Sequence, residues 1–230
     1  IETLRELSPL APLHNPAGIL GIEAAKKVFG DIPNVAVFDT TSRIPAEKFS
    51  YALNQRLPED IVIQSSKQVA DDFHPRHCDC RKTYEYDILN RTFPLPAYRN
   101  TAYFLYGTLN IKAMRRACQA FLGEHDFASF CAAGAQVQTT VRTIYSLEVE
   151  CRPLTEANAG SADQLLTIRV KGNGFLYNMV RIIAGTLVEV GRGHIKPEEV
   201  AGIIAAKDRA KAGPTAPARG LRLVEIEYLQ

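Results

Sequence analysis

Residues 172–191, GNGFLYNMVRIIAGTLVEVG, form the segment that most constrains the fold, because they read as a long, predominantly apolar helix that contains one arginine, Arg181. A helix that is hydrophobic all round must be buried between other layers of structure. No apolar run in the chain reaches the roughly 18 residues that a membrane span needs. The segment therefore predicts a core helix of a globular protein, and 230 residues with 46% hydrophobic residues suffice for one large domain or two small ones.

The segments around this helix predict the layers that cover it. Residues 81–90, 140–153 and 165–174 alternate polar and apolar side chains, as half-buried strands do, and the last two can pair as a hairpin. Residues 110–122 form an amphipathic helix that Gly123 closes, residues 196–208 form another that Pro197 opens, and a final strand follows residue 220. Towards the N-terminus we expect helices at residues 16–29 and after Pro45, and strands at residues 34–41 and 61–69. The predicted class is α+β, a largely antiparallel sheet with helices on one face.

Charge and cysteine content narrow the protein class only a little. The formal net charge is +2, and residues 1–41 hold three Lys/Arg against five Asp/Glu, so the rest of the chain is mildly basic. That bias is compatible with a nucleic-acid partner. The five cysteines are irregularly spaced; HCDC, with His74 and His77 beside it, could be drawn as a metal cluster, but reduced thiols are the expected state in a cytoplasmic protein. The first 20 residues lack the order of a signal peptide, and we expect a cytoplasmic location.

Arg181 has two possible environments in such a helix. It could hold a carboxylate or a phosphate in a site, and the small residues Ala184 and Gly185 on its side would let another chain segment or a ligand approach. It could equally face water in a polar stripe with Asn178, Glu189 and Arg192. The helical pattern alone does not separate the two readings.

Six stretches from residue 42 onward resemble, in order, the tRNA pseudouridine synthase A family. They are SRIPAEKFSYALNQRLPEDI, FHPRHCDCRKTYEY, FLGEHDFASF, TVRTIY, GNGFLYNMVRIIAGTLVEVGRG and DRAKAGPTAPARGLRL. Residues 1–41, with PLHNP and VFDT, instead resemble an internal piece of acetate kinase. The chain is therefore interpreted as a chimera: an acetate-kinase-like segment over residues 1–41, an incomplete N-terminal half of the synthase-like domain over residues 42–107, and its C-terminal half over residues 108–230.

The resemblance implies a role for individual residues. Synthases of this family use an aspartate nucleophile in a loop that reads like R-T-D-A-G-V-H, a string that this chain does not contain. Arg181 matches the arginine that pairs with that aspartate, Tyr84 matches the tyrosine that stacks on the flipped uridine, and Leu176 would line the same pocket. Asp39 is a weak substitute for the nucleophile. Candidates for contacts with RNA phosphates are Lys82, Arg43, Arg56, Arg76 and Arg81, and Arg209 is expected to support the rim of the site.

The resemblance further implies a tRNA substrate modified in its anticodon arm, a homodimer, and no metal or cofactor. Because the aspartate loop is not found, two outcomes stay open: an active synthase, or an inactive chimera that keeps a tRNA-binding scaffold. A remote alternative is an acetate kinase fragment, for which His14, Asn15 and Asp39 match positions near the phosphate and acetate site of that enzyme.

Overall fold

A computed structural model describes residues 45–75, 78–135, 137–154 and 163–229 of the chain. The helix predicted at residues 16–29 and the strand at 34–41 lie outside these ranges. The chain divides into two compact units, Ile1–Cys78 and Asp79–Gln230.

The described part of the first unit is built around one short helix. A 3-10 turn, η2 (Ala46–Lys48), leads into α3 (Phe49–Asn54), as the sequence after Pro45 predicted. The strand expected at residues 61–69 is wrong, because that segment is extended but joins no ladder among the described residues. Instead the Asn54 amide donates to the carbonyl of Ile63 and accepts from its N–H, both at 2.8 Å. Side-chain bonds thus replace a partner strand there.

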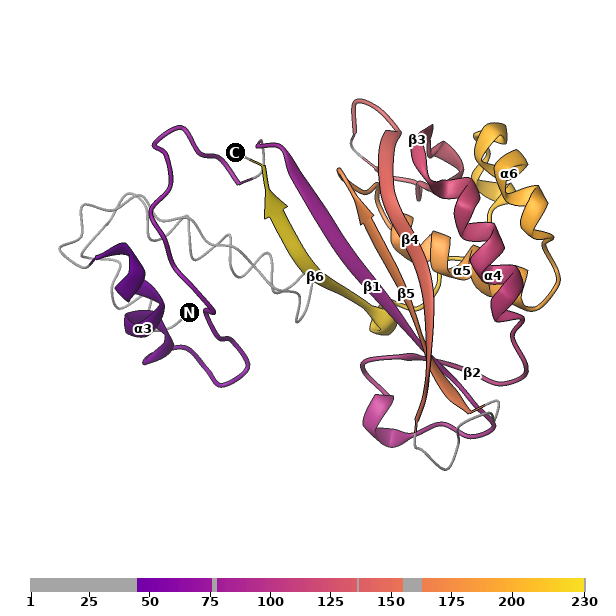
Figure 1. Cartoon of the computed structure of the whole chain (residues 1–230), viewed down its shortest axis with the longest axis horizontal. Coiled ribbons are helices and arrows are strands. Elements are labelled where there is room, and N and C mark those ends of the chain that lie inside the picture. The colour runs from indigo at the N-terminus through magenta and orange to yellow at the C-terminus, as the bar shows by residue number, and fades with distance from the viewer. Residues whose placement is uncertain (1–44, 76–77, 136, 155–162, 230) are drawn as a thin grey trace. The chain divides into compact units, whose positions relative to one another are not determined.

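The second unit contains a six-stranded sheet (Figure 1). Its strands are β1 (Cys80–Asn90), β2 (Tyr103–Leu105), β3 (Gly123–Asp126), β4 (Val141–Pro153), β5 (Gln164–Gly172) and β6 (Leu221–Tyr228). The order is β2-β1-β5-β4-β3, and β6 also pairs with β1. All pairs are antiparallel except β1 with β2, and β4 and β5 form the predicted hairpin. The short strands β2 and β3 were not predicted, since three or four residues carry too little alternation.

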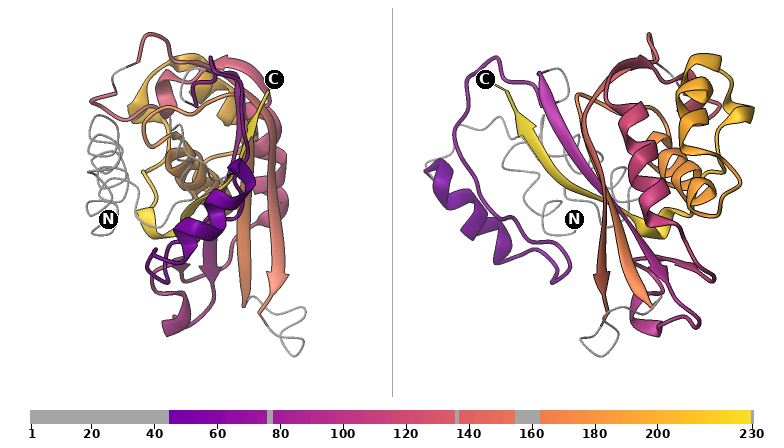
Figure 2. Two further views of the ribbon diagram at one scale, coloured as in Figure 1. Left: turned by 90° about the vertical axis from the view of Figure 1, so that its left-hand side faces the viewer. Right: turned by 45° about the vertical axis from the view of Figure 1, so that its right-hand side comes forward.

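Helices cover one face of this sheet, seen from two further sides in Figure 2. They are α4 (Ile111–Cys118), which continues as η4 (Gln119–Phe121), then α5 (Met179–Gly191) and α6 (Val200–Ala206), which η7 (Pro197–Glu199) precedes. Four more single turns, η3 (Pro96–Tyr98), η5 (Ala128–Phe130), η8 (Arg209–Lys211) and η9 (Ala218–Gly220), lie in the connections. The α+β class, with its largely antiparallel sheet and one-sided helices, is confirmed.

Helix α5 is the centre of the core, as its composition required. Eleven of its thirteen residues are buried, and they pack with α4, α6 and the inward side chains of β1, β4 and β5 in one cluster. The helix begins at Met179 rather than directly after the strand, because Asn178 takes a left-handed conformation and residues 173–178 form a loop. No helix among the described residues is long and apolar enough to cross a membrane.

Candidate active site around Arg181

The loop between β5 and α5 is fixed to the neighbouring strand β4. Asn173 donates its N–H to the Thr143 carbonyl at 3.1 Å, and its side-chain oxygen accepts the Thr143 N–H at 2.9 Å. Gly172 is required here, since an added Cβ would lie 2.9 Å from the Thr143 carbonyl and 3.2 Å from Cζ of Phe175. The glycine therefore lets the Phe175 ring lie against the strand, beside β1.

Tyr84 meets this loop from β1. Its ring contacts Phe175 edge to face, with 5.2 Å between centroids and 82° between planes, which is a favoured aromatic geometry. Burial raises the pKa of the Tyr84 phenol, so the side chain is neutral at physiological pH. The ring is only partly buried, and it packs at the margin of the core. This position is compatible both with a tyrosine that only packs against the core and with a platform for a base.

Tyr86, two residues further along β1, is fully buried and joins the strand to the C-terminal segment. Its hydroxyl donates to the Pro217 carbonyl at 2.7 Å. Burial raises the pKa of Tyr86 well above its ordinary value, and Tyr103 adds to this, while the charges of Arg181 and Arg219 act in the opposite direction. The phenol thus stays protonated and remains a hydrogen-bond donor.

Arg181 lies in the first turn of α5 and is held by two neutral acceptors. Its Nε donates to the Ala216 carbonyl at 2.7 Å, and its Nη1 donates to Oδ1 of Asn178 at 2.9 Å. The Ala216 N–H donates back to the Arg181 carbonyl at 3.1 Å. Within the described part of the chain, no carboxylate lies within 4.0 Å of the guanidinium.

The segment that carries Ala216 packs closely against α5. An added Cβ at Gly185 would lie 1.8 Å from the Pro214 carbonyl, so only glycine permits this approach. The Gly213 N–H donates to the Thr186 hydroxyl at 2.9 Å. The small residues beside Arg181 therefore do admit another chain segment, as expected. Arg209 supports that segment by donating to the Gly213 carbonyl at 2.9 Å and to the Thr215 hydroxyl at 3.1 Å.

The chain was compared with known proteins. The profile of the tRNA pseudouridine synthase family matches residues 117–229. A protein named tRNA pseudouridine synthase A from Ruminiclostridium cellulolyticum is 49% identical over 194 residues, which is 84% of this chain and 76% of that protein. The chain belongs to the tRNA pseudouridine synthase A family. Relatives of the same name from Bacillus subtilis and Acetivibrio thermocellus are 46% and 44% identical, over 83% and 90% of this chain and 73% and 82% of theirs.

The N-terminal segment gives a second match. The profile of the acetokinase family matches residues 1–66. This match extends beyond residue 41, the predicted end of the kinase-like segment. Because 84% of the chain also matches the synthase of Ruminiclostridium cellulolyticum, the two matches must overlap. Both resemblances found in the sequence are therefore present.

The other residues predicted for the synthase-like and acetate-kinase-like sites fall into four groups. Leu176 is 4% exposed and belongs to the core cluster. Lys82 and Arg81 are partly exposed on β1, and the Arg81 guanidinium lies over the Tyr145 ring, 5.0 Å from its centroid. Arg56 is exposed in the first unit. The remaining candidates lie outside the described residues: Arg43, Arg76, His14, Asn15 and Asp39.

The sequence did not indicate that Phe175 would contact Tyr84. Arg181 and Glu189 are the residues of α5 that are not buried, and the polar stripe considered for this helix is present as two separate sets of contacts: Asn178 binds Arg181, whereas Glu189 binds Arg192 and His194. An asparagine that precedes a helix and can adopt a positive φ was the available signal.

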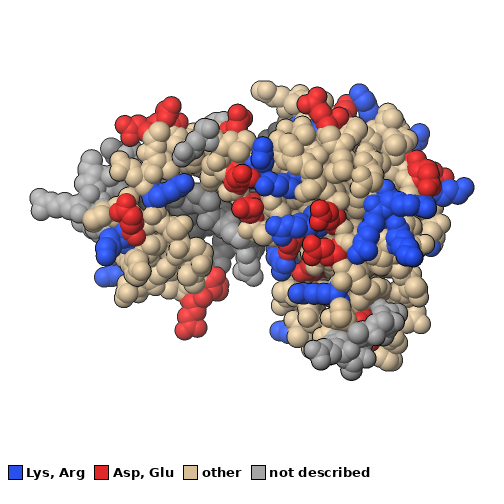
Figure 3. Space-filling model, in the orientation of Figure 1, with Lys and Arg blue, Asp and Glu red and all other residues tan. Residues whose placement is uncertain are grey.

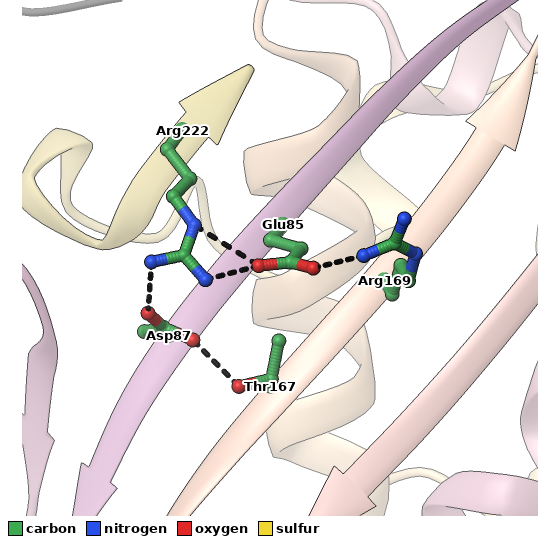
Figure 4. A network of polar contacts seen from close by, with 5 residues as sticks. All are labelled: Glu85, Asp87, Thr167, Arg169 and Arg222. Carbon is green, nitrogen blue, oxygen red and sulfur yellow. Dashed lines mark hydrogen bonds and ion pairs between the residues drawn. The ribbon is translucent and has the colours of Figure 1, made fainter. Parts of the chain in front are cut away.

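Acidic and metal-binding groups near the site are few in the described part of the chain. Glu85 and Asp87 flank Tyr86 in sequence, but alternation along the strand turns them to the opposite face, where arginines bind them (Figure 4). All five cysteines are free thiols. The described residues contain no group of three or more potential metal ligands, and His77 of the possible cluster lies outside them.

Proposed function

We propose that this chain is a tRNA pseudouridine synthase, which isomerises uridine to pseudouridine in the anticodon arm of tRNA. The observation that carries the proposal is the state of Arg181. Its guanidinium is oriented by two neutral acceptors and keeps its positive charge available, beside a loop that seats Phe175 against Tyr84. Membership of the synthase family supports the same assignment.

In the proposed reaction the bond between uracil N1 and ribose C1′ breaks, the base turns, and C5 joins C1′, while the C5 proton leaves to solvent and N1 takes up a proton. No oxidant or reductant enters, so no cofactor is needed. Tyr84 receives the flipped base, whose extraction from its stack costs a few kcal/mol. Arg181 holds the carboxylate of the nucleophilic aspartate, and Leu176 closes the pocket beside it.

Phosphates of the RNA are held by basic side chains, because backbone charge dominates the affinity of nucleic-acid binding. The proposed contacts are Lys82, Arg81, Arg56, Arg43 and Arg76. In the described part of the chain, basic side chains also gather over α4, and acidic and basic ones are interleaved along the strands (Figure 3). We further propose that the protein is a cytoplasmic homodimer, and that it consists of an acetate-kinase-like segment over residues 1–41 joined to a synthase-like domain whose incomplete N-terminal half is residues 42–107 and whose C-terminal half is residues 108–230.

The source of the carboxylate separates this proposal from its alternative. In the active form, Asp39 is the candidate nucleophile, since the family's loop string does not occur in the sequence. The alternative is an inactive chimera that keeps a tRNA-binding scaffold; the absence of a carboxylate next to Arg181 among the described residues favours it. A kinase role for His14 and Asn15 is only a remote alternative, because an acetate kinase also requires its large nucleotide-binding part.

Release of tritium from an unmodified tRNA transcript that carries 5-tritiated uridine tests the proposal. We expect release by the wild type, a loss of at least about a hundredfold in Arg181→Ala, and retention in Arg192→Ala, which removes an arginine just beyond the end of the same helix. Asp39→Asn identifies the nucleophile. No release by the wild type, with tRNA still retarded in a gel-shift assay, would establish the inactive scaffold instead.

A further inference from the structure

We propose that Asn178 is a positioning residue, which orients the Arg181 guanidinium without neutralising its charge. The inference rests on the proposed function of Arg181 and adds a residue to it. The first observation is the backbone conformation of Asn178. Asn178 precedes α5 with φ 58° and ψ 11°, and the only other non-glycine residue with positive φ in the described ranges is Lys207. The left-handed region disfavours most L-residues, and asparagine is one of the few that tolerate it.

The conformation of Asn178 joins it to the helix in two ways. Its carbonyl accepts the Ile182 N–H at 3.0 Å, so the backbone starts the helix. Its side-chain Oδ1 accepts Nη1 of Arg181 at 2.9 Å, three residues further along. Asn178 makes no side-chain bond to the free N–H groups of the first turn, which is the usual work of a residue at this position. Its amide is thus committed to the arginine.

The two acceptors of Arg181 leave one edge of the guanidinium available. Nε is bound to the Ala216 carbonyl and Nη1 to Asn178, whereas Nη2 makes no hydrogen bond within the described part of the chain. Both acceptors are uncharged. A carboxylate at residue 178 would reach Nη1 with the same geometry, but it would form an ion pair and compensate the charge that a catalytic carboxylate or an RNA phosphate needs. A neutral amide gives orientation alone.

A simpler explanation is that asparagine is present only because it tolerates the left-handed backbone. Glycine adopts that conformation more easily still, so Asn178→Gly keeps the backbone and deletes the amide. Asn178→Asp keeps both the shape of the side chain and a residue that tolerates positive φ, but adds a charge. The pair of variants therefore separates backbone, orientation and charge.

The experiment combines steady-state measurement of tritium release with 15N NMR of the arginine side chains. In Asn178→Gly we expect kcat to fall by about tenfold, with KM within about twofold of the wild type, because misorientation acts on the reacting geometry. In Asn178→Asp we expect a fall of about a hundredfold in kcat. In the NMR spectrum, rotation about the Cζ–Nη1 bond of Arg181 should be slow in the wild type and in Asn178→Asp, and fast in Asn178→Gly.

Each outcome bears on one proposal. Unchanged kcat and unchanged Nη1 rotation in Asn178→Gly would overturn the positioning role. A kcat for Asn178→Asp equal to or above that of Asn178→Gly would overturn the requirement for a neutral acceptor. If the wild type releases no tritium, the proposed function fails; the NMR measurement then still decides whether Asn178 orients Arg181, and the ionic-strength dependence of tRNA binding decides whether Asn178→Asp has compensated its charge.

Discussion

Both faces of β1 are buried, but apolar packing stabilises one face and ion pairs and hydrogen bonds stabilise the other. Tyr86 and Ile88 point to the helices and are fully buried in the apolar cluster, where burial itself stabilises the fold. Glu85 and Asp87 point to the other face and are nearly as deeply buried, with 7% and 6% exposure. Their burial is possible because basic and polar side chains of the adjacent strands cover them (Figure 4).

The register of the sheet produces this cover. Glu85 lies directly opposite Arg169 of β5 and Arg222 of β6, and both guanidinium groups bind its carboxylate. Asp87 accepts the Thr167 hydroxyl at 2.7 Å, and Arg222 Nη1 lies 3.4 Å from its other oxygen. Acidic residues that lie next to a candidate catalytic tyrosine in the sequence can therefore have a structural role. Alternation places them a sheet's thickness away from the site.

The largest expected effect comes from the apolar face. Ile168 of β5 is fully buried in the core cluster, and Ile168→Ala should lower the free energy of unfolding by about 2 to 5 kcal/mol, through lost burial and the cavity left behind. Its neighbour Thr167 faces the charged side, and Thr167→Ala should cost about 1 kcal/mol, the value of one hydrogen bond. Denaturation in urea measures both, and equal losses would mean that the two faces contribute alike.

A smaller effect is expected on the charged face, and it depends on pH. Burial alone would raise the pKa of Glu85, but hydrogen bonds and charges from Arg222 and Arg169 outweigh it and hold the pKa below its ordinary value. A depressed pKa in the folded state stabilises the protein above the unfolded pKa of about 4.3, and this contribution is lost as the pH falls through the folded pKa.

The variant Glu85→Gln isolates that contribution. It should lower the free energy of unfolding at pH 7 by about 1 to 3 kcal/mol, as expected for hydrogen bonds to a charged group. The difference from the wild type should shrink as the pH falls from the unfolded pKa of about 4.3 through the lower pKa of the folded state, because the wild-type carboxylate then becomes protonated too. Urea titrations between pH 7 and pH 3 give the difference directly. A difference that is constant over this range would show that the charge of Glu85 is unimportant.

The contrast between the two faces also explains what the sequence could predict. Long segments with a clear period, such as the β4–β5 hairpin and the buried α5, were found because one pattern determines each of them. The segment at residues 61–69 begins with three β-branched residues, which favour a strand, but it lacks a partner strand among the described residues, and strand pairing is a tertiary property. From the sequence alone, the charged face of β1 is expected to be exposed to solvent. It is buried in the structure, because Arg169 and Arg222, about 80 and 140 positions away along the chain, lie over it.

For the candidate site, the sequence gives a prediction of residues but not of geometry. Family resemblance points to Tyr84 and Arg181 as site residues, and small residues in α5 indicated a close approach to that helix. What the sequence could not give was the identity of the approaching segment, residues 213–216, or the exchange of hydrogen bonds between Ala216 and Arg181. Every residue has a main-chain carbonyl, so the residue type does not indicate which carbonyl will accept a hydrogen bond from Arg181.

The smallest effect expected is that of removing one of the two arginines from Glu85. Arg222 is 56% exposed in its side chain, and Arg222→Ala should lower the free energy of unfolding by about 1 kcal/mol or less, because water solvates such pairs and Arg169 still binds the carboxylate. The exposed pair Arg116–Glu198 provides the matched control, and Arg116→Ala should change stability less still.

The pair of arginines should nevertheless couple strongly. Once Arg169 and Arg222 are both replaced by alanine, Glu85 is left buried without either of its charged partners, and its carboxylate must become protonated or draw water into the sheet. The loss in the double variant should therefore exceed the sum of the single losses by about 0.5 to 3 kcal/mol. Strict additivity in urea denaturation would mean that the charged face tolerates an unpaired acid, and that its arginines are not what permits burial there.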